Sequence, residues 1–154
     1  MAWLADRAQD KRAAHAHDLA AHEADPEGFP LPLEIDENFC RQTAMDTLDD
    51  LPRIYREMIA HVPIVIQPHP DPWMLRGNEI GASAFGAYIG KSLLDSSVLD
   101  SGDMPATIYV FSRCLARRCR SLAEARAELR LTILHELAHH LGFDEDEMAR
   151  LGLS

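Results

Sequence analysis

The fold of this chain of 154 residues is decided by residues 121–142, SLAEARAELRLTILHELAHHLG. Ser121 followed by Glu124 forms a capping box, Gly142 can close a helix in a left-handed conformation, and no proline interrupts the stretch between them. Apolar residues recur at helical spacing in two adjacent rows, which predicts one long helix whose second half is largely buried. Like charges four residues apart oppose an isolated helix, so we expect packing to stabilise this one.

This helix carries a His-Glu-x-x-His motif. His135 and His139 are one turn apart on the same face, close enough for both imidazoles to bind a single zinc ion. Glu136 lies about 100° further round the helix, where its carboxylate can accept a proton from a metal-bound water and pass it to a leaving amine. The alternative without a metal is that the two histidines have their hydrogen-bond partners within a core, beside an exposed glutamate.

A hydrolytic zinc ion usually takes three protein ligands and leaves one position for water. If Gly142 turns the chain back, the side chain three residues further on can meet the metal, and that residue is Glu145. Asp144 and Asp146 flank it and remain alternatives. The structural interpretation of this acidic run is the first turn of a short helix, residues 145–151, with Asp144 as its N-cap and Glu147 closing a capping box.

The segment from His135 to Gly142, followed by an acidic cluster, resembles the small bacterial zincin-like metallopeptidases, also called minimal zincins. The resemblance covers residues 39–153 and includes weaker agreement in residues 85–90 and 107–111. It implies peptidase activity and a zinc site of two histidines and one aspartate. This sequence has Glu145 at the aspartate position, one methylene longer, which leaves the third ligand open.

Composition excludes several classes of function. A net charge of −10 argues against nucleic-acid binding and against an anionic membrane surface, because both need clustered lysine and arginine. No basic start precedes an apolar stretch, and no run of about 18 apolar residues could span a bilayer, so a cytoplasmic protein is expected. Three cysteines lack metal-type spacing, which favours a reducing compartment and buried or idle thiols.

Residues 1–34 are predicted to form an extension that precedes the domain. Residues 2–24 are rich in alanine and predict a helix, and the proline-containing stretch 26–32 predicts a linker. A second metal site is an alternative for the histidines of this helix, but they lack a carboxylate or cysteine partner at ligand spacing, which favours a solvated face. Those histidines are His15, His17 and His22.

Residues 35–61 predict a second helix that Pro52 kinks or divides. Its apolar positions include Phe39, Met45, Leu48, Leu51 and Ile54.

Strands are expected at residues 62–66, where Pro63 favours an edge, and at residues 106–111. Residues 80–90 predict a third strand whose glycines mark a close backbone approach, either by a substrate or by a bend or bulge within the sheet. Residues 94–105 predict a loop.

Four arginines surround two cysteines in residues 113–120, which predict a short helix or turn. A solvated face is the favoured interpretation of the arginines, with an anion- or partner-binding patch as the alternative. The same cations could depress the pKa of the thiols of Cys114 and Cys119.

Together these patterns predict an α+β fold: a small mixed β-sheet packed against the motif-bearing helix, with residues 1–34 as a helical extension and residues 35–154 as the zincin-like domain. The predicted function is zinc-dependent peptide-bond hydrolysis, with His135, His139 and Glu145 binding Zn²⁺ and Glu136 as general base. The expected partner is a peptide or protein substrate. Little chain follows the motif, so the site should be shallow, and a protein partner could complete the cleft. The alternative is a non-catalytic interaction or scaffold protein that keeps the fold with or without metal.

Overall fold

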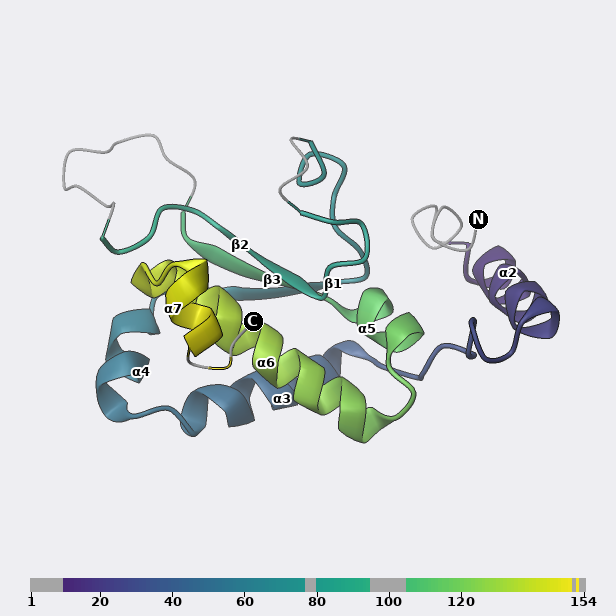
Figure 1. The fold of residues 1–154 in the computed structure, drawn as a ribbon, viewed down its shortest axis with the longest axis horizontal. Helices are drawn as coiled ribbons and strands as arrows, with labels where there is room; N and C mark the ends of the chain where they lie inside the picture. Colours follow the sequence, from purple (N-terminus) through teal and green to yellow (C-terminus); the bar gives the residue numbers. More distant parts are fainter. Residues whose placement is uncertain (1–9, 77–79, 95–104, 151, 153–154) are drawn as a thin grey trace.

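The architecture is α+β, with six helices and three strands in the part of the chain that the computed structural model describes, residues 10–76, 80–94, 105–150 and 152 (Figure 1). The predicted loop at residues 94–105 lies almost wholly outside these residues. The helices are α2 (Lys11–Ala24), α3 (Glu37–Asp49), α4 (Arg53–Ile59), α5 (Ser112–Arg118), α6 (Leu122–Leu141) and α7 (Glu145–Arg150). The strands are β1 (Ile64–Gln67), β2 (Gly86–Ile89) and β3 (Thr107–Phe111).

The sheet is mixed and has the strand order β1-β3-β2. β1 runs parallel to β3, with Ile64 opposite Ile108, whereas β2 runs antiparallel to β3. The prediction of a sheet edge at Pro63 is confirmed, since β1 is an outer strand. β3 lies in the centre and is the most buried strand, as its run of β-branched and aromatic residues predicts.

Helix α6 confirms the prediction made from its caps. Ser121 accepts a hydrogen bond from the Glu124 N–H (3.1 Å), and Gly142 ends the helix with φ 91°, in the left-handed region that glycine adopts without strain. The Glu124 carboxylate accepts from the Arg120 N–H (2.7 Å) rather than from that of the cap residue. Helices α6 and α3 lie together on one face of the sheet (Figure 1).

The main core fills the space between these two helices and the sheet. Its fully buried members include Ile108 and Val110 from the central strand and Leu129 and Ile133 from α6. The charged face of α6 pairs with α3, since Arg130 donates to the Asp50 carboxylate (2.7 Å). Packing and these contacts with α3 therefore provide the stability that the like charges along α6 oppose.

Pro52 divides the predicted second helix into α3 and α4. Two of the apolar positions named for this segment are exposed, Met45 at 53% and Ile54 at 64%. α3 instead buries smaller side chains against the core, and two of them are threonines whose hydroxyls bond to the carbonyl four residues earlier. These residues are Cys40, Thr43, Ala44 and Thr47.

The third predicted strand is shorter than expected, because only residues 86–89 of the segment 80–90 pair with β3. Gly86 has the close neighbour that its glycine predicts. A Cβ atom at this position would lie 2.7 Å from the Tyr109 carbonyl oxygen and 2.6 Å from the Thr132 side chain of α6. The missing side chain therefore lets α6 lie against the sheet. The register of β2 with β3 contains no bulge, whereas the chain bends on either side of the strand, at Phe85 and Gly90.

The N-terminal helix α2 packs beside α5, at the end of the molecule away from α7 (Figure 1). The Asp18 carboxylate accepts hydrogen bonds from Arg117 Nε (3.1 Å) and Nη2 (3.2 Å). The following segment is held by the Leu33 N–H, which donates to the Ala116 carbonyl (2.8 Å). The boundary at residue 34 between an extension and a domain remains a prediction. Within the described residues, no helix is both long and apolar enough to cross a membrane.

Candidate metal centre

Two histidines on the last turns of α6 form the centre of the candidate site. His135 Nε2 and His139 Nε2 lie 3.1 Å apart, and both rings are partly exposed. Nitrogen ligands at about 2.0–2.1 Å from a tetrahedral zinc ion are about 3.3 Å apart, so this separation fits a shared ion. The alternative placed both histidines within the core beside an exposed glutamate, whereas both rings are partly exposed and Glu136 is buried.

Glu145 joins the two histidines from the start of α7. Gly142 ends α6 and turns the chain, after which Glu145 Oε1 lies 3.5 Å from His139 Nε2. One possible ligand atom from each of the three residues lies within 4.8 Å of the other two. Two imidazoles and a carboxylate are a donor set that suits zinc, so the residues present fit the ion that the sequence implies.

Asp144 is the N-cap of α7, which is the structural role that the sequence analysis gave as one interpretation. Its carboxylate accepts from the Glu147 N–H (2.8 Å), while the Glu147 carboxylate accepts from the Asp144 N–H (3.0 Å), which makes a reciprocal capping box. Neither Asp144 nor Asp146 belongs to the group of His135, His139 and Glu145. The acidic run is thus both the first turn of α7 and the source of a candidate ligand.

The protonation of His139 favours metal binding. Burial lowers the pKa of this imidazole, and the neighbouring His135 lowers it further, against an opposing effect of the Glu145 carboxylate. The neutral ring is therefore favoured at neutral pH, and a neutral ring nitrogen is the form that can coordinate a metal.

Glu136 lies beside this group and is buried, with 9% of its surface exposed. Burial raises the pKa of its carboxyl group, which Glu145 raises further, while His135 and a hydrogen bond from the Tyr88 backbone N–H lower it. A carboxyl group whose pKa is raised above its ordinary value is suited both to accept a proton and to return it. The arrangement thus combines three metal donors with a candidate general base.

The sequence patterns missed one link between the strand β2 and the end of α6. His140 is 1% exposed, and its Nδ1 lies 2.9 Å from the Tyr88 hydroxyl. That hydroxyl donates its one proton to the Lys91 carbonyl, so His140 Nδ1 is the donor in the shared bond. Tyr88 therefore contacts α6 twice, through its main chain at Glu136 and through its side chain at His140.

The solvated face that the sequence favoured for the arginines of residues 113–120 is confirmed for Arg118 and Arg120, which are exposed, and is wrong for the other two. Arg113 and Arg117 have side chains only 28% and 20% exposed, and both pair with Asp18. The thiol prediction is also wrong for Cys119, because burial raises its pKa to about 11 despite a lowering effect of Arg118. All three cysteines are free and buried, as predicted.

The histidines of α2 form no metal group with the other described residues. His15 and His17 are exposed, which agrees with the solvated face that the sequence favoured. His22 Nδ1 lies 2.9 Å from the Phe29 carbonyl oxygen, so it helps hold the segment that follows the helix.

Comparison with known protein families identifies a relationship. A family model described as zincin-like metallopeptidase matches residues 59–153, a span that contains all three strands, α6 and α7. Helices α2 and α3 precede the matched span. None of the curated proteins compared with the chain matches it.

Proposed function

The chain belongs to the zincin-like metallopeptidase family, and from this we propose that it is a zinc-dependent peptidase that cleaves peptides or proteins. The observation that carries the proposal is the gathering of His135, His139 and Glu145 from two helices, with the buried carboxylate of Glu136 beside them. Structural zinc sites close with a fourth protein ligand, whereas catalytic sites keep one position open. A group of three donors in the described residues favours the catalytic class.

Each residue has a separate task in the proposed reaction. When bound, zinc supplies a Lewis acid that polarises the scissile carbonyl and makes a water more acidic. His135 and His139 hold the ion as neutral imidazoles, and Glu145 completes the donor set. Glu136 accepts the proton of the attacking water and hands it to the leaving amine nitrogen, so its carboxyl group returns to its starting state.

The strand β2 is the proposed binding edge for an extended substrate. It is an outer strand of the sheet and lies next to the α6 helix that carries Glu136. A peptide can add to such an edge through main-chain hydrogen bonds. Gly86 does not make room for this peptide, since its missing side chain accommodates α6.

The proposed site is open to solvent. The side chain of Glu145 is 72% exposed and that of His139 is 32% exposed. Water is poorly excluded from such a site, and weak exclusion lowers both substrate binding and the strength of electrostatic catalysis. We therefore expect low intrinsic turnover, or a protein partner that completes the cleft.

Two substitutions test the proposal. Glu136→Gln should leave the zinc content of the purified protein unchanged and reduce turnover of a mixed peptide library by about 10²- to 10⁴-fold. His139→Ala should abolish zinc binding. Asp146→Asn is the matched control, because it removes an acidic side chain of α7 that lies outside the metal group, and it should change neither quantity.

Unchanged turnover in Glu136→Gln would exclude this residue as the base. Equal zinc content in His139→Ala would exclude it as a ligand. If the wild-type protein binds zinc but cleaves no peptide, either alone or in a cell extract that supplies protein partners, the non-catalytic scaffold is the correct function.

A further inference from the structure

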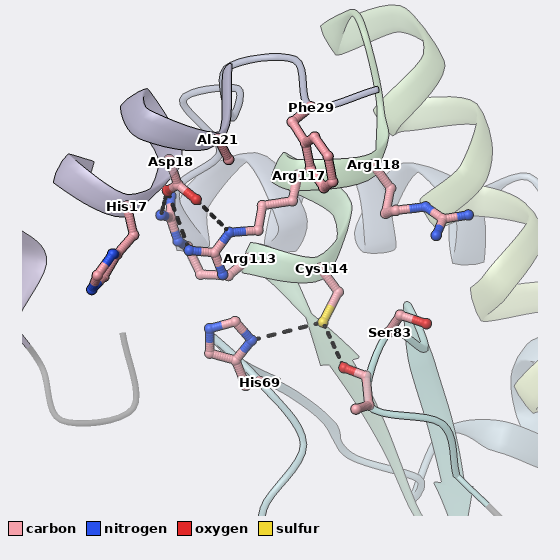
Figure 2. A pocket seen from close by; sticks show the side chains of 11 residues that line it. His17, Asp18, Ala21, Phe29, His69, Ser83, Arg113, Cys114, Arg117 and Arg118 are labelled. Atoms are coloured by element: carbon pink, nitrogen blue, oxygen red, sulfur yellow. Dashed lines mark hydrogen bonds and ion pairs between the residues drawn. The ribbon is translucent and has the colours of Figure 1, made fainter. Parts of the chain in front are cut away.

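A cavity separate from the candidate metal centre lies at the other end of the molecule from α7, between α2, α5 and two loops (Figure 2). Its volume is about 410 Å³, a size that accommodates a small organic molecule. Its wall includes three exposed residues, so it opens to solvent; these are His17, Ala82 and Ser83. The same wall holds a thiol and an imidazole side by side, those of Cys114 and His69.

The topology of the sheet explains why the thiol and the imidazole meet. β1 and β3 are parallel, so their carboxyl ends lie at the same edge of the sheet. His69 follows the end of β1 by two residues, and Cys114 follows the end of β3 by three. Figure 2 shows the two side chains facing each other at the cavity wall, with Cys114 Sγ 3.8 Å from His69 Nδ1.

This contact is one that can activate a thiol. A cysteine attacks an electrophile through its thiolate form, so a neighbouring base that takes the thiol proton increases its reactivity. The Cys114 sulfur also lies 3.7 Å from the Ala82 carbonyl oxygen, which accepts a hydrogen bond but is far too weak a base to take up the proton. A neutral imidazole can take it up, and His69 is therefore the base of this pair.

The other two cysteines provide a comparison within the same chain. Cys40 and Cys119 belong to the main core, whereas Cys114 belongs to a second, smaller cluster of buried residues. The pKa of both thiols in the main core is raised to about 11, by burial and by acidic neighbours. Neither of these two thiols lines the cavity. A reagent that enters the cavity therefore meets Cys114.

From this geometry we propose that Cys114 is a site of covalent modification, at which a small, uncharged α,β-unsaturated carbonyl compound in the cavity adds to the thiol. The cavity wall also includes apolar side chains that can contact the carbon skeleton of such a compound, those of Ala21, Phe29 and Ala82. The site is independent of the proposed peptidase function, since none of the cavity residues belongs to the candidate metal group.

The proposed addition needs no oxidant and no further reactant. His69 Nδ1 accepts the proton of the Cys114 thiol, and an electron pair of the sulfur forms a bond to the β-carbon of the compound. The π-electron pair of the carbon–carbon double bond moves to the α-carbon, which then takes the proton from the imidazolium. One S–H bond and one π bond break, one S–C bond and one C–H bond form, and the imidazole returns to its starting state.

N-Ethylmaleimide is a suitable probe, because it is small, uncharged and of this chemical class. In the folded full-length protein it should modify Cys114 at least about tenfold faster than Cys40 and Cys119, measured by mass spectrometry of proteolytic peptides. In urea the three thiols should react at similar rates, because unfolding removes the differences in their surroundings.

Histidine variants test the named base. His69→Asn places an amide that cannot take up a proton near the position of Nδ1, and should slow the modification of Cys114 by at least about tenfold. His17→Gln is the matched control, at an exposed histidine of the same cavity wall, and should leave the rate unchanged. Slow reaction of Cys40 and Cys119 in each variant shows that it is folded, and His69→Gln replaces His69→Asn if the shorter side chain does not support the fold.

Three results would overturn the proposal. One is modification of Cys114 in the folded wild type at a rate no higher than those of the two thiols of the main core. Another is an unchanged rate at Cys114 in a folded His69 variant. The third is oxidation of Cys114 by hydrogen peroxide without any reaction with N-ethylmaleimide, which would contradict addition to carbon as the chemistry of this site.

Discussion

Two glutamates of the candidate site have opposite surroundings. Glu136 is 9% exposed and faces the strand β2, where burial raises the pKa of its carboxyl group. The Glu145 side chain is 72% exposed at the start of α7. A metal ligand needs a carboxylate that stays ionised, whereas a base that must also release its proton benefits from a raised pKa. The difference in burial therefore separates the two proposed roles.

The buried carboxylate of Glu136 should lower the stability of the metal-free protein at neutral pH. Its pKa in the folded state is raised, so its contribution to stability is present at low pH and is lost as pH rises through that value. The substitution Glu136→Gln replaces the ionisable group with an amide, so this loss of stability does not occur in the variant. We expect the Tm of the chelator-treated variant to exceed that of the wild type by about 2–4 °C at pH 7, equivalent to about 1 kcal/mol in a domain of this size.

The pH dependence of this difference provides the control. At pH 4 the Glu136 carboxyl group of the wild type is largely protonated and therefore as uncharged as the amide of the variant, so the two proteins should have nearly equal Tm values in calorimetry. A difference that stays constant from pH 4 to pH 7 would contradict the raised pKa of Glu136.

Neighbouring residues at the start of α7 should separate metal binding from capping. Glu145→Ala should weaken zinc binding by at least about tenfold in a chelator competition, since even partners outside the ligand shell contribute that much. Asp144→Ala removes the cap of α7 and should cost about 1 kcal/mol of stability while keeping zinc affinity. The reverse pattern would identify Asp144 as the ligand.

At the scale of elements, the sequence predicted the helix ends and breaks that depend on residues close together in the chain. The caps Ser121 and Gly142 mark both ends of α6, and Pro52 marks the break between α3 and α4. The exposure of Met45 and Ile54 was not predictable in this way, because an apolar row does not say which neighbour will cover it. The length of β2 likewise depends on its pairing with β3, and not on its own residues.

The candidate site likewise has features that follow from nearby residues and one that depends on residues far apart in the chain. Helical spacing placed His135 and His139 together, and the helix end at Gly142 brought Glu145 within reach. The link between Tyr88 and His140 joins residues 52 positions apart, so no local pattern could reveal it.

The close approach of α6 to the sheet should be sensitive at one glycine. In Gly86→Ala the new methyl group would meet the Tyr109 carbonyl and the Thr132 side chain at less than 3 Å. We expect a loss of about 1–3 kcal/mol in the free energy of unfolding, measured by urea denaturation. Gly81→Ala is the matched control, because no atom lies within 4 Å of the position that its new methyl group would occupy, and it should have little effect. Equal stabilities would show that β2 can move away from α6 without cost.

At the scale of the molecule, polar contacts join α2 to the part that the family matches. Asp18 is the central one, with a side chain only 9% exposed and two arginine partners. Long-range pairs of this kind cannot be predicted from spacing, since Asp18 and Arg117 are 99 residues apart. These ion pairs hold α2 against α5, a position that the sequence alone did not predict.

Removal of this carboxylate should loosen α2 selectively. Asp18→Asn removes a charged contact between α2 and two partly buried arginines of α5, so we expect faster hydrogen exchange of the α2 amides. The amides of α6 and β3 should keep their protection, because the main core does not include α2. Glu23→Gln, at an exposed acidic residue of the same helix, is the control. Unchanged exchange in Asp18→Asn would show that apolar contacts such as buried Ala14 hold the helix.

The two contacts of Tyr88 have a practical consequence. Its main-chain N–H donates to the Glu136 carboxylate, so gain or loss of a proton there alters the electron density around that N–H. A backbone ¹⁵N signal from this one residue is thus a reporter for the charge of the proposed base. A titration curve recorded at that signal would give the ionisation midpoint directly, with neither a substrate nor a turnover assay.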